Sequence, residues 1–269
     1  MARSRGSRGE MPFLDHLEEL RWRILWCILS VMIGAVVGFG LVYYLNVLEL
    51  LVEPVRRAYD NPDLKLIYLS PSDSFFVTLR LAIYAGLLMA FPFLAYHMWA
   101  FLSPALKPQE RRVIIPPLYG GLVLFAAGVA LAYWIALPVT LEFFQRFQTE
   151  SLQANLEINA TLGFIVKMLM AFGFVFELPI VIMILSWMGI VTPEFLRAKR
   201  RHAIVLITVL ASFITPGDVI VLTFMMMVPL ILLYEVGIFL SVGIYRRKAQ
   251  REEDFETDTT PPTGSVETQ

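Results

Sequence analysis

The segment that decides the fold runs from Ala160 to Gly189 and reads ATLGFIVKMLMAFGFVFELPIVIMILSWMG. It is longer than the roughly 20 apolar residues that a helix needs to cross a bilayer. Glu177 lies near its middle, where an ionised carboxylate costs about 2.5 to 3.5 kcal/mol on insertion scales. Pro179 predicts a bend beside this acid, because proline cannot donate a hydrogen bond to the carbonyl of Val175. Glu177 therefore either forms a modest bond to another helix of the chain or has a functional role.

The composition is that of an integral membrane protein. Of the 269 residues, 57% are hydrophobic, and they fall in long blocks. The net charge of -1 gives no overall bias toward nucleic acid or an acidic substrate. Cys27 is the sole cysteine, so an internal disulfide framework and a cysteine metal cluster are excluded. The first apolar run, after Arg23, is too long for a signal-peptide core and is predicted to be a retained span.

Together with this segment, the apolar blocks on either side of it predict an all-α protein with six transmembrane helices. The predicted spans lie at about 22–44, 75–102, 113–137, 161–188, 203–214 and 219–245. They form a membrane domain over 11–246, after a basic N-terminal segment, 1–10. The tail, 247–269, has too little apolar content to fold alone and is predicted to be disordered. The first and third loops are too polar to cross the hydrocarbon and are expected to lie on the surface as amphipathic segments.

The fifth span is unusually short, with about a dozen apolar residues before the turn that contains Pro216, Gly217 and Asp218. A run well under 20 residues predicts that the membrane is thinned there, or that neighbouring helices compensate by tilting. We give the two explanations equal weight.

The distribution of basic residues predicts that both termini are cytoplasmic. The N-terminal region, the second and fourth loops and the tail together carry 16 Lys and Arg residues. The opposite loops carry six, even when Arg80 and Lys167 within the spans are included. Such an asymmetry orients a membrane protein with its more basic side inward.

The motifs argue against enzymatic chemistry. The three histidines, His16, His97 and His202, lack the close pairing of a zinc site, so no metal is expected. No glycine-rich phosphate-binding loop is present, and Gly217-Asp218 matches only half of the Gly-x-Gly-Asp signature of intramembrane proteases. Two classes remain: a proton-coupled secondary transporter using Glu177, and a receptor that gathers other membrane proteins. We expect no enzyme activity and no cofactor.

Five motifs together resemble the TatC family, the multispanning receptor subunit of the twin-arginine protein translocase. In chain order they read HLEELRWR, YHMWAFLSPALKPQERR, MAFGFVFELP, SWMGIVTPEFLRAKRR and FITPGDV. The resemblance covers about residues 11–246. One departure is Gly217, where many members have a second proline, and this puts the local turn shape in doubt more than the role of Asp218.

The resemblance implies a glove-like, concave bundle in the bacterial cytoplasmic membrane, with external loops that form a cap. It also implies that the protein binds twin-arginine signal peptides of folded substrates and recruits the single-span partners TatA and TatB. Export would use the proton motive force, and the subunits would associate in a complex. Glu177 would be the span-four acid exposed in the concave face, where we expect it to contact a polar residue of a partner span.

The resemblance places the site for the arginine pair at Glu19 and Glu110, before spans one and three. The planar fork of arginine binds a carboxylate through two parallel hydrogen bonds, which lysine cannot reproduce, so two acids could select Arg-Arg over Lys-Lys. Taken alone, the residues favour another interpretation, in which Glu19 pairs with Arg23 and Glu110 is a helix-start acid. Arg21 and Phe101 are expected to shape the site, Arg21 by orienting the acids.

Overall fold

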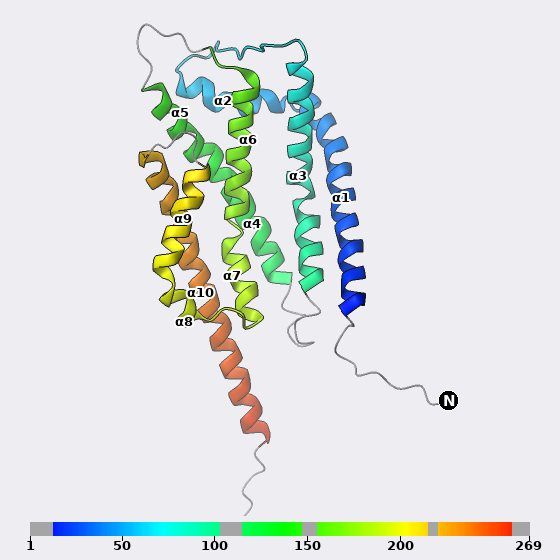
Figure 1. Ribbon diagram of the computed structural model, residues 1–269, viewed down its shortest axis with the longest axis vertical. Helices are drawn as coiled ribbons and strands as arrows, with labels where there is room; N and C mark the ends of the chain where they lie inside the picture. Colours follow the sequence, from blue (N-terminus) through cyan, green and yellow to red (C-terminus); the bar gives the residue numbers. More distant parts are fainter. Residues whose placement is uncertain (1–12, 103–114, 147–154, 215–219, 260–269) are drawn as a thin grey trace, which may run out of the picture. The chain divides into compact units, whose positions relative to one another are not determined.

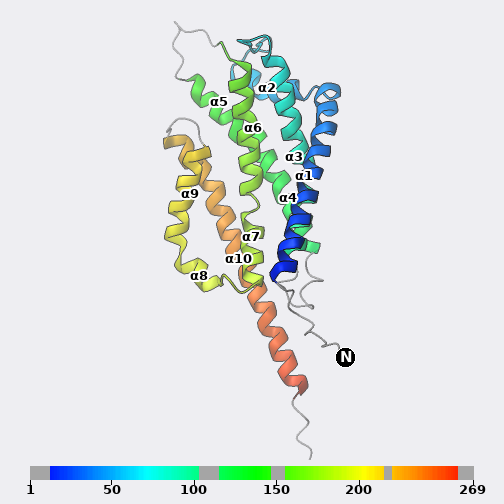
Figure 2. The ribbon, with the colours of Figure 1, turned by 45° about the vertical axis from the view of Figure 1, so that its right-hand side comes forward.

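The computed structural model describes residues 13–102, 115–146, 155–214 and 220–259, and these form an all-helical chain (Figures 1 and 2). They divide into two compact units, residues 1–177 and 178–269. The helices of the first unit are α1 (Phe13–Tyr44), α2 (Val47–Ala58), α3 (Asp73–Leu102), α4 (Ile115–Leu131), the π-helix η3 (Ala132–Ala136), α5 (Leu137–Gln145) and α6 (Ile158–Val175). Those of the second are α7 (Leu178–Trp187), α8 (Pro193–Ala198), α9 (Arg200–Ile214) and α10 (Ile220–Thr259).

In the first unit, α1 and α3 run antiparallel and in close contact, because glycines remove the side chains between their backbones (Figure 1). A Cβ added at Gly34 would lie 2.5 Å from the Gly86 carbonyl oxygen, and one added at Gly86 would lie 2.3 Å from the Ala35 nitrogen. Small residues allow this approach, which supplies packing contacts in a setting where lipid is as apolar as the helices.

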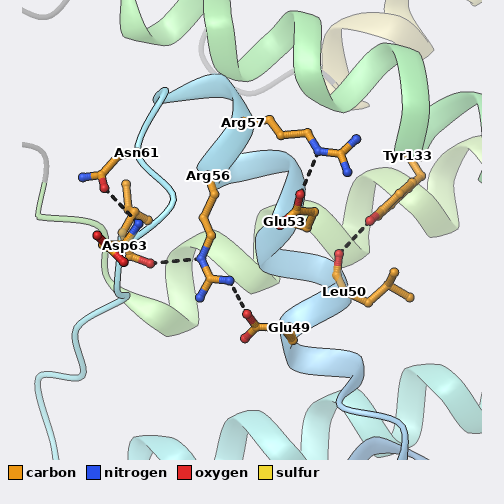
Figure 3. Close-up of polar contacts among 9 residues, drawn as sticks. Glu49, Leu50, Glu53, Arg56, Arg57, Asn61, Asp63 and Tyr133 are labelled. Carbon is orange, nitrogen blue, oxygen red and sulfur yellow. Dashed lines mark hydrogen bonds and ion pairs between the residues drawn. The ribbon is translucent and has the colours of Figure 1, made fainter.

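Helix α2 lies across the end of this unit at which α3 and α6 begin (Figures 1 and 2). One face of α2, which includes Leu51 and Val55, is buried, while ion pairs join Glu49 to Arg56 and Glu53 to Arg57 (Figure 3). The Tyr133 hydroxyl of η3 donates to the Leu50 carbonyl at 2.7 Å. The amphipathic character expected of the first loop is therefore that of α2.

The start of α6 is tied to the loop after α2. The Ile67 backbone accepts from Ile158 N–H and donates to the Leu156 carbonyl, both at 2.9 Å. The Glu157 carboxylate caps α6 by accepting from the N–H groups of Asn159 and Ala160. Desolvation acts to raise the pKa of Glu157, but the hydrogen bonds from Ala160 and Asn159 outweigh it and lower that pKa below its usual value.

In the second unit, α10 packs along α7 and contacts α8 and α9. The buried Ser186 hydroxyl of α7 donates to that of Ser241 of α10 at 2.7 Å. Thr192 caps α8 by accepting from Phe195 N–H at 3.1 Å, and Pro193 begins the helix, a combination typical of helix starts.

By length and composition, five helical segments of the described residues could span a membrane: Leu17–Tyr44, Asp73–Phe101, Leu118–Gln145, Ile158–Trp187 and Met226–Arg247. The chain is thus a multi-pass membrane protein. The remaining predicted span, 203–214, falls in α9, which has 15 residues and does not reach the length of the other five.

The C-terminal tail differs from the prediction. Disorder was expected from residue 247, but α10 continues to Thr259 and has 40 residues in all. The segment after Arg247 is rich in Arg, Lys, Gln and Glu, which have high helix propensity, and it continues a helix already nucleated in the apolar span. Residues 260–269 lie outside the described part of the chain.

Candidate functional site

Glu19 lies in the first turns of α1 and is held by an arginine of the same helix. The Arg23 Nε donates to Glu19 Oε1 at 3.0 Å, and Arg23 Nη2 donates to the same oxygen. Both side chains are 22% exposed. This i,i+4 pair is the one that the spacing of the two residues predicted. The carboxylate thus already binds one guanidinium.

The register of α1 and α3 brings Phe101 to the level of Glu19. Gly34 lies beside Gly86, and Gly38 lies beside Ala82, so both contacts follow one antiparallel register. Counting 15 residues back from Gly34 reaches Glu19, and counting 15 forward from Gly86 reaches Phe101. The beginning of α1 and the end of α3 therefore bring these two predicted site residues to the same end of the unit.

Of the other two predicted residues of this site, the structure describes Arg21 but not Glu110. Arg21 is on α1 and is exposed, and it takes no part in the pair between Glu19 and Arg23. Glu110, the second predicted acid, lies within 103–114, outside the described residues.

Glu177 lies at an interruption in the fourth predicted span. The first helix of this span, α6, ends at Val175, and α7 begins at Leu178, with Glu177 in the turn between them. The Glu177 N–H donates to the Phe174 carbonyl at 3.1 Å, a shorter-range bond than those of an α-helix. The break beside the acid that Pro179 predicted is confirmed.

The Glu177 carboxylate lies against the backbone of α4. A Cβ added at Gly121 would lie 2.9 Å from Glu177 Oε2 and 3.3 Å from Oε1, so glycine at this position leaves room for both oxygens. Glu177 Oε1 is buried and, among the described residues, accepts no hydrogen bond. An acceptor of this kind in an apolar environment favours a donor that the described residues do not supply, or a bound proton.

The role of Gly121 could not be read from the sequence. The only signal was the pair Gly120-Gly121 inside an otherwise apolar span, which is typical of close helix approach but does not identify the partner. The predicted turn residue Asp218 lies within 215–219, outside the described residues. No group of His, Cys, Asp and Glu suited to a metal ion occurs in the part of the chain that the structure describes.

Comparison with known proteins gives one consistent result. The family model described as Sec-independent protein translocase protein (TatC) matches residues 15–229. The chain is 36% identical to TatC of Aquifex aeolicus over 242 residues, which cover 89% of this chain and 98% of that protein. It is 35% identical to TatC of Escherichia coli K12 over 243 residues, which cover 90% and 92% of the two chains.

A solved structure agrees with these sequence matches. The crystal structure of the twin-arginine translocase receptor TatC superimposes with a TM-score of 0.73 at 36% identity. The match covers 86% of this chain and 99% of that one.

Proposed function

Because the chain belongs to the TatC family, we propose that it receives the arginine pair of its substrates at a cytoplasmic site built around Glu19 and Glu110. As a family member it is a receptor subunit of the twin-arginine translocase, a protein-transport component and not an enzyme. The alternative of a proton-coupled secondary transporter has no support among these matches.

The observation that best supports this proposed site is the pairing of Glu19 with Arg23. The half-buried Glu19 carboxylate binds the guanidinium of Arg23 through two donors, which is the kind of interaction that a signal-peptide arginine would make with it. A signal-peptide arginine would compete with Arg23 for Glu19, and the second arginine would bind Glu110. The exposed Arg21 would orient the acids, and Phe101, at the level of Glu19, would border the peptide.

The ion pairs account for selectivity more than for affinity. Exposed pairs contribute about 0.2 to 1 kcal/mol each, whereas burial of the peptide's apolar segment contributes roughly 25 cal/mol per Å². We therefore propose that the apolar segment lies against the spans and supplies most of the binding free energy.

The remaining assignments follow from the family and the charge pattern. We propose that the protein lies in the bacterial cytoplasmic membrane with both termini inside, and that α9 makes the sixth crossing. Its partners would be single-span proteins of the TatA and TatB type, with Glu177 contacting one of their spans. The subunits would associate in a complex. Export through this complex would use the proton motive force.

The site is tested by the binding of signal peptides to the purified protein in detergent. A twin-Arg peptide should bind more tightly than its twin-Lys counterpart, and the Glu19→Ala, Glu110→Ala double variant should bind the twin-Arg peptide about 2- to 30-fold more weakly. Glu18→Ala, which removes a neighbouring exposed acid, is the matched control and should bind like the wild type. Equal affinity for both peptides in all of these proteins would falsify the site.

A further inference from the structure

Two basic side chains inside the predicted spans come together on α3 and α6. A Cβ added at Gly163 of α6 would lie 3.7 Å from Arg80 Nη1 of α3, so the guanidinium lies over the Gly163 position. Lys167 is one turn further along α6 than Gly163, on the same face. Helical side chains lean toward the N-terminus of their helix, which directs the Lys167 stem back toward the Arg80 guanidinium. Both side chains are exposed, although Gly163 and most of α6 are buried.

Neither cation has an ionic partner among the described residues. The ion pairs there are Glu19–Arg23, Glu49–Arg56, Glu53–Arg57 and Arg200–Glu235. The acids nearest in sequence to the starts of α3 and α6 are occupied elsewhere. Asp73 accepts from the N–H groups of Leu69 and Ser70 at 3.0 and 2.7 Å, and Glu157 caps α6. Charges within membrane spans are normally paired, so this cation pair calls for an anion that the described residues do not supply.

The depth of the pair matches that of lipid phosphate. The span Asp73–Phe101 has 29 residues and Ile158–Trp187 has 30, about 45 Å at 1.5 Å per residue against a hydrocarbon core of roughly 30 Å. If the spans are centred, their first five or so residues lie among the headgroups. Arg80 and Lys167 then begin a few ångströms inside the hydrocarbon, and their long side chains carry the charges out to the phosphates.

An apolar surface continues from the cations toward the membrane centre. Ile83 follows Arg80 by one turn of α3 and is 47% exposed, and Phe174 follows Lys167 by two turns of α6 and is also 47% exposed. The Phe174 ring meets the Phe91 ring of α3 edge-on, with centroids 6.2 Å apart, so the two helices remain adjacent along this surface. This surface is charged near the starts of α3 and α6 and apolar toward the membrane centre, which makes it complementary to a phospholipid.

We propose that Arg80 and Lys167 together bind the phosphate of one phospholipid, in the leaflet on the side where α3 and α6 begin. An acyl chain of this lipid lies along Ile83 and Phe174. Guanidinium and ammonium groups between membrane helices are suited to lipid headgroups, and arginine can bind two phosphate oxygens at once. An anionic lipid such as phosphatidylglycerol fits better than zwitterionic phosphatidylcholine, whose own cation opposes the pair.

The test is native mass spectrometry of the full-length protein, titrated with phosphatidylglycerol or phosphatidylcholine in detergent. The wild type should retain phosphatidylglycerol at concentrations about fivefold or more below those needed for phosphatidylcholine. Arg80→Gln with Lys167→Gln should lose this preference. Lys65→Gln, which removes an exposed positive charge beyond α2, should keep it. Unchanged phosphatidylglycerol retention in the double variant would overturn the proposal.

Two further measurements separate a lost site from a misfolded protein or a different occupant. Arg80→Lys with Lys167→Arg preserves both charges and should retain the lipid preference, and loss of the preference in this variant would contradict a site based on charge. A photo-reactive phenylalanine at Ile83 should crosslink to phospholipid in cell membranes. Crosslinking to a protein span in place of lipid would show that another chain covers this surface, and would overturn the lipid assignment.

Discussion

A carboxylate held against a helix backbone within an apolar span needs a donor, and Glu177 is in this position. Replacement by Ala should weaken association with the proposed single-span partner more than it weakens signal-peptide binding, because we propose that the partner span supplies this donor. Glu177→Gln should keep part of the association, since its amide still forms hydrogen bonds. The measurement is site-specific crosslinking between α6 and the partner span.

The matched control for Glu177 is Glu142→Ala, which removes an exposed acid of α5. This variant should crosslink to the partner like the wild type. Unchanged crosslinking in Glu177→Ala would mean that the acid only forms a bond within the chain.

Glu177 could be identified from the sequence, but its surroundings could not. Placing an ionised carboxylate in an apolar span costs free energy in any fold, and proline interrupts a helix wherever it occurs. Both features therefore depend on neighbouring residues alone. Gly121 meets the carboxylate only because α4 packs on α6 in one particular register. The position of Arg80 beside Gly163 likewise depends on the packing of α3 on α6.

The pairing of α1 with α3 depends on the absence of a side chain at Gly86. Gly86→Ala places a Cβ against the backbone of Ala35, which can move only if the whole helix moves. The free energy of unfolding of the purified protein should therefore fall by about 1 to 3 kcal/mol. Gly40→Ala on α1 is the control, because a Cβ there meets nothing within 4 Å. This variant should raise the free energy of unfolding by up to about 1 kcal/mol, because alanine has a higher helix propensity than glycine.

These two alanine variants are compared by thermal unfolding in detergent. The expected result is a lower melting temperature for Gly86→Ala and an equal or higher one for Gly40→Ala. A fall of similar size in both would show that close backbone approach is not what glycine provides here.

The short helix α9 tests whether a thin membrane matters for transport. Its 15 residues span about 22 Å, well under the roughly 30 Å of the hydrocarbon core. Insertion of four leucines after Leu206 should leave membrane insertion intact but reduce export of a twin-arginine substrate. Val205→Leu with Val209→Leu raises apolarity at constant length and should export normally. Full export by the longer helix would favour compensation by tilted neighbours.

The limits of α8 and α10 show which element boundaries a sequence determines. The start of α8 could be predicted, because Thr192 suits the N-cap and Pro193 suits the first helical position whatever the rest of the fold. The end of α10 could not, because its charged extension has both the polarity of a disordered tail and the propensity of a helix. The continuous helix that precedes the extension decides between them.

The charge asymmetry of the chain predicts its orientation in the membrane, and α10 makes that prediction directly testable. At 40 residues it is about 60 Å long, roughly twice the hydrocarbon thickness, so its charged end projects well beyond the span Met226–Arg247. With 16 Lys and Arg residues on one side and at most six on the other, this end should lie in the cytoplasm. In a Cys27→Ser background, an impermeant maleimide added to spheroplasts should label Ser72→Cys, before α3, but label Gln250→Cys only after lysis. Labelling of Gln250→Cys in intact spheroplasts would contradict this orientation and would place Glu19 away from the cytoplasmic side, where we propose that the arginine pair binds.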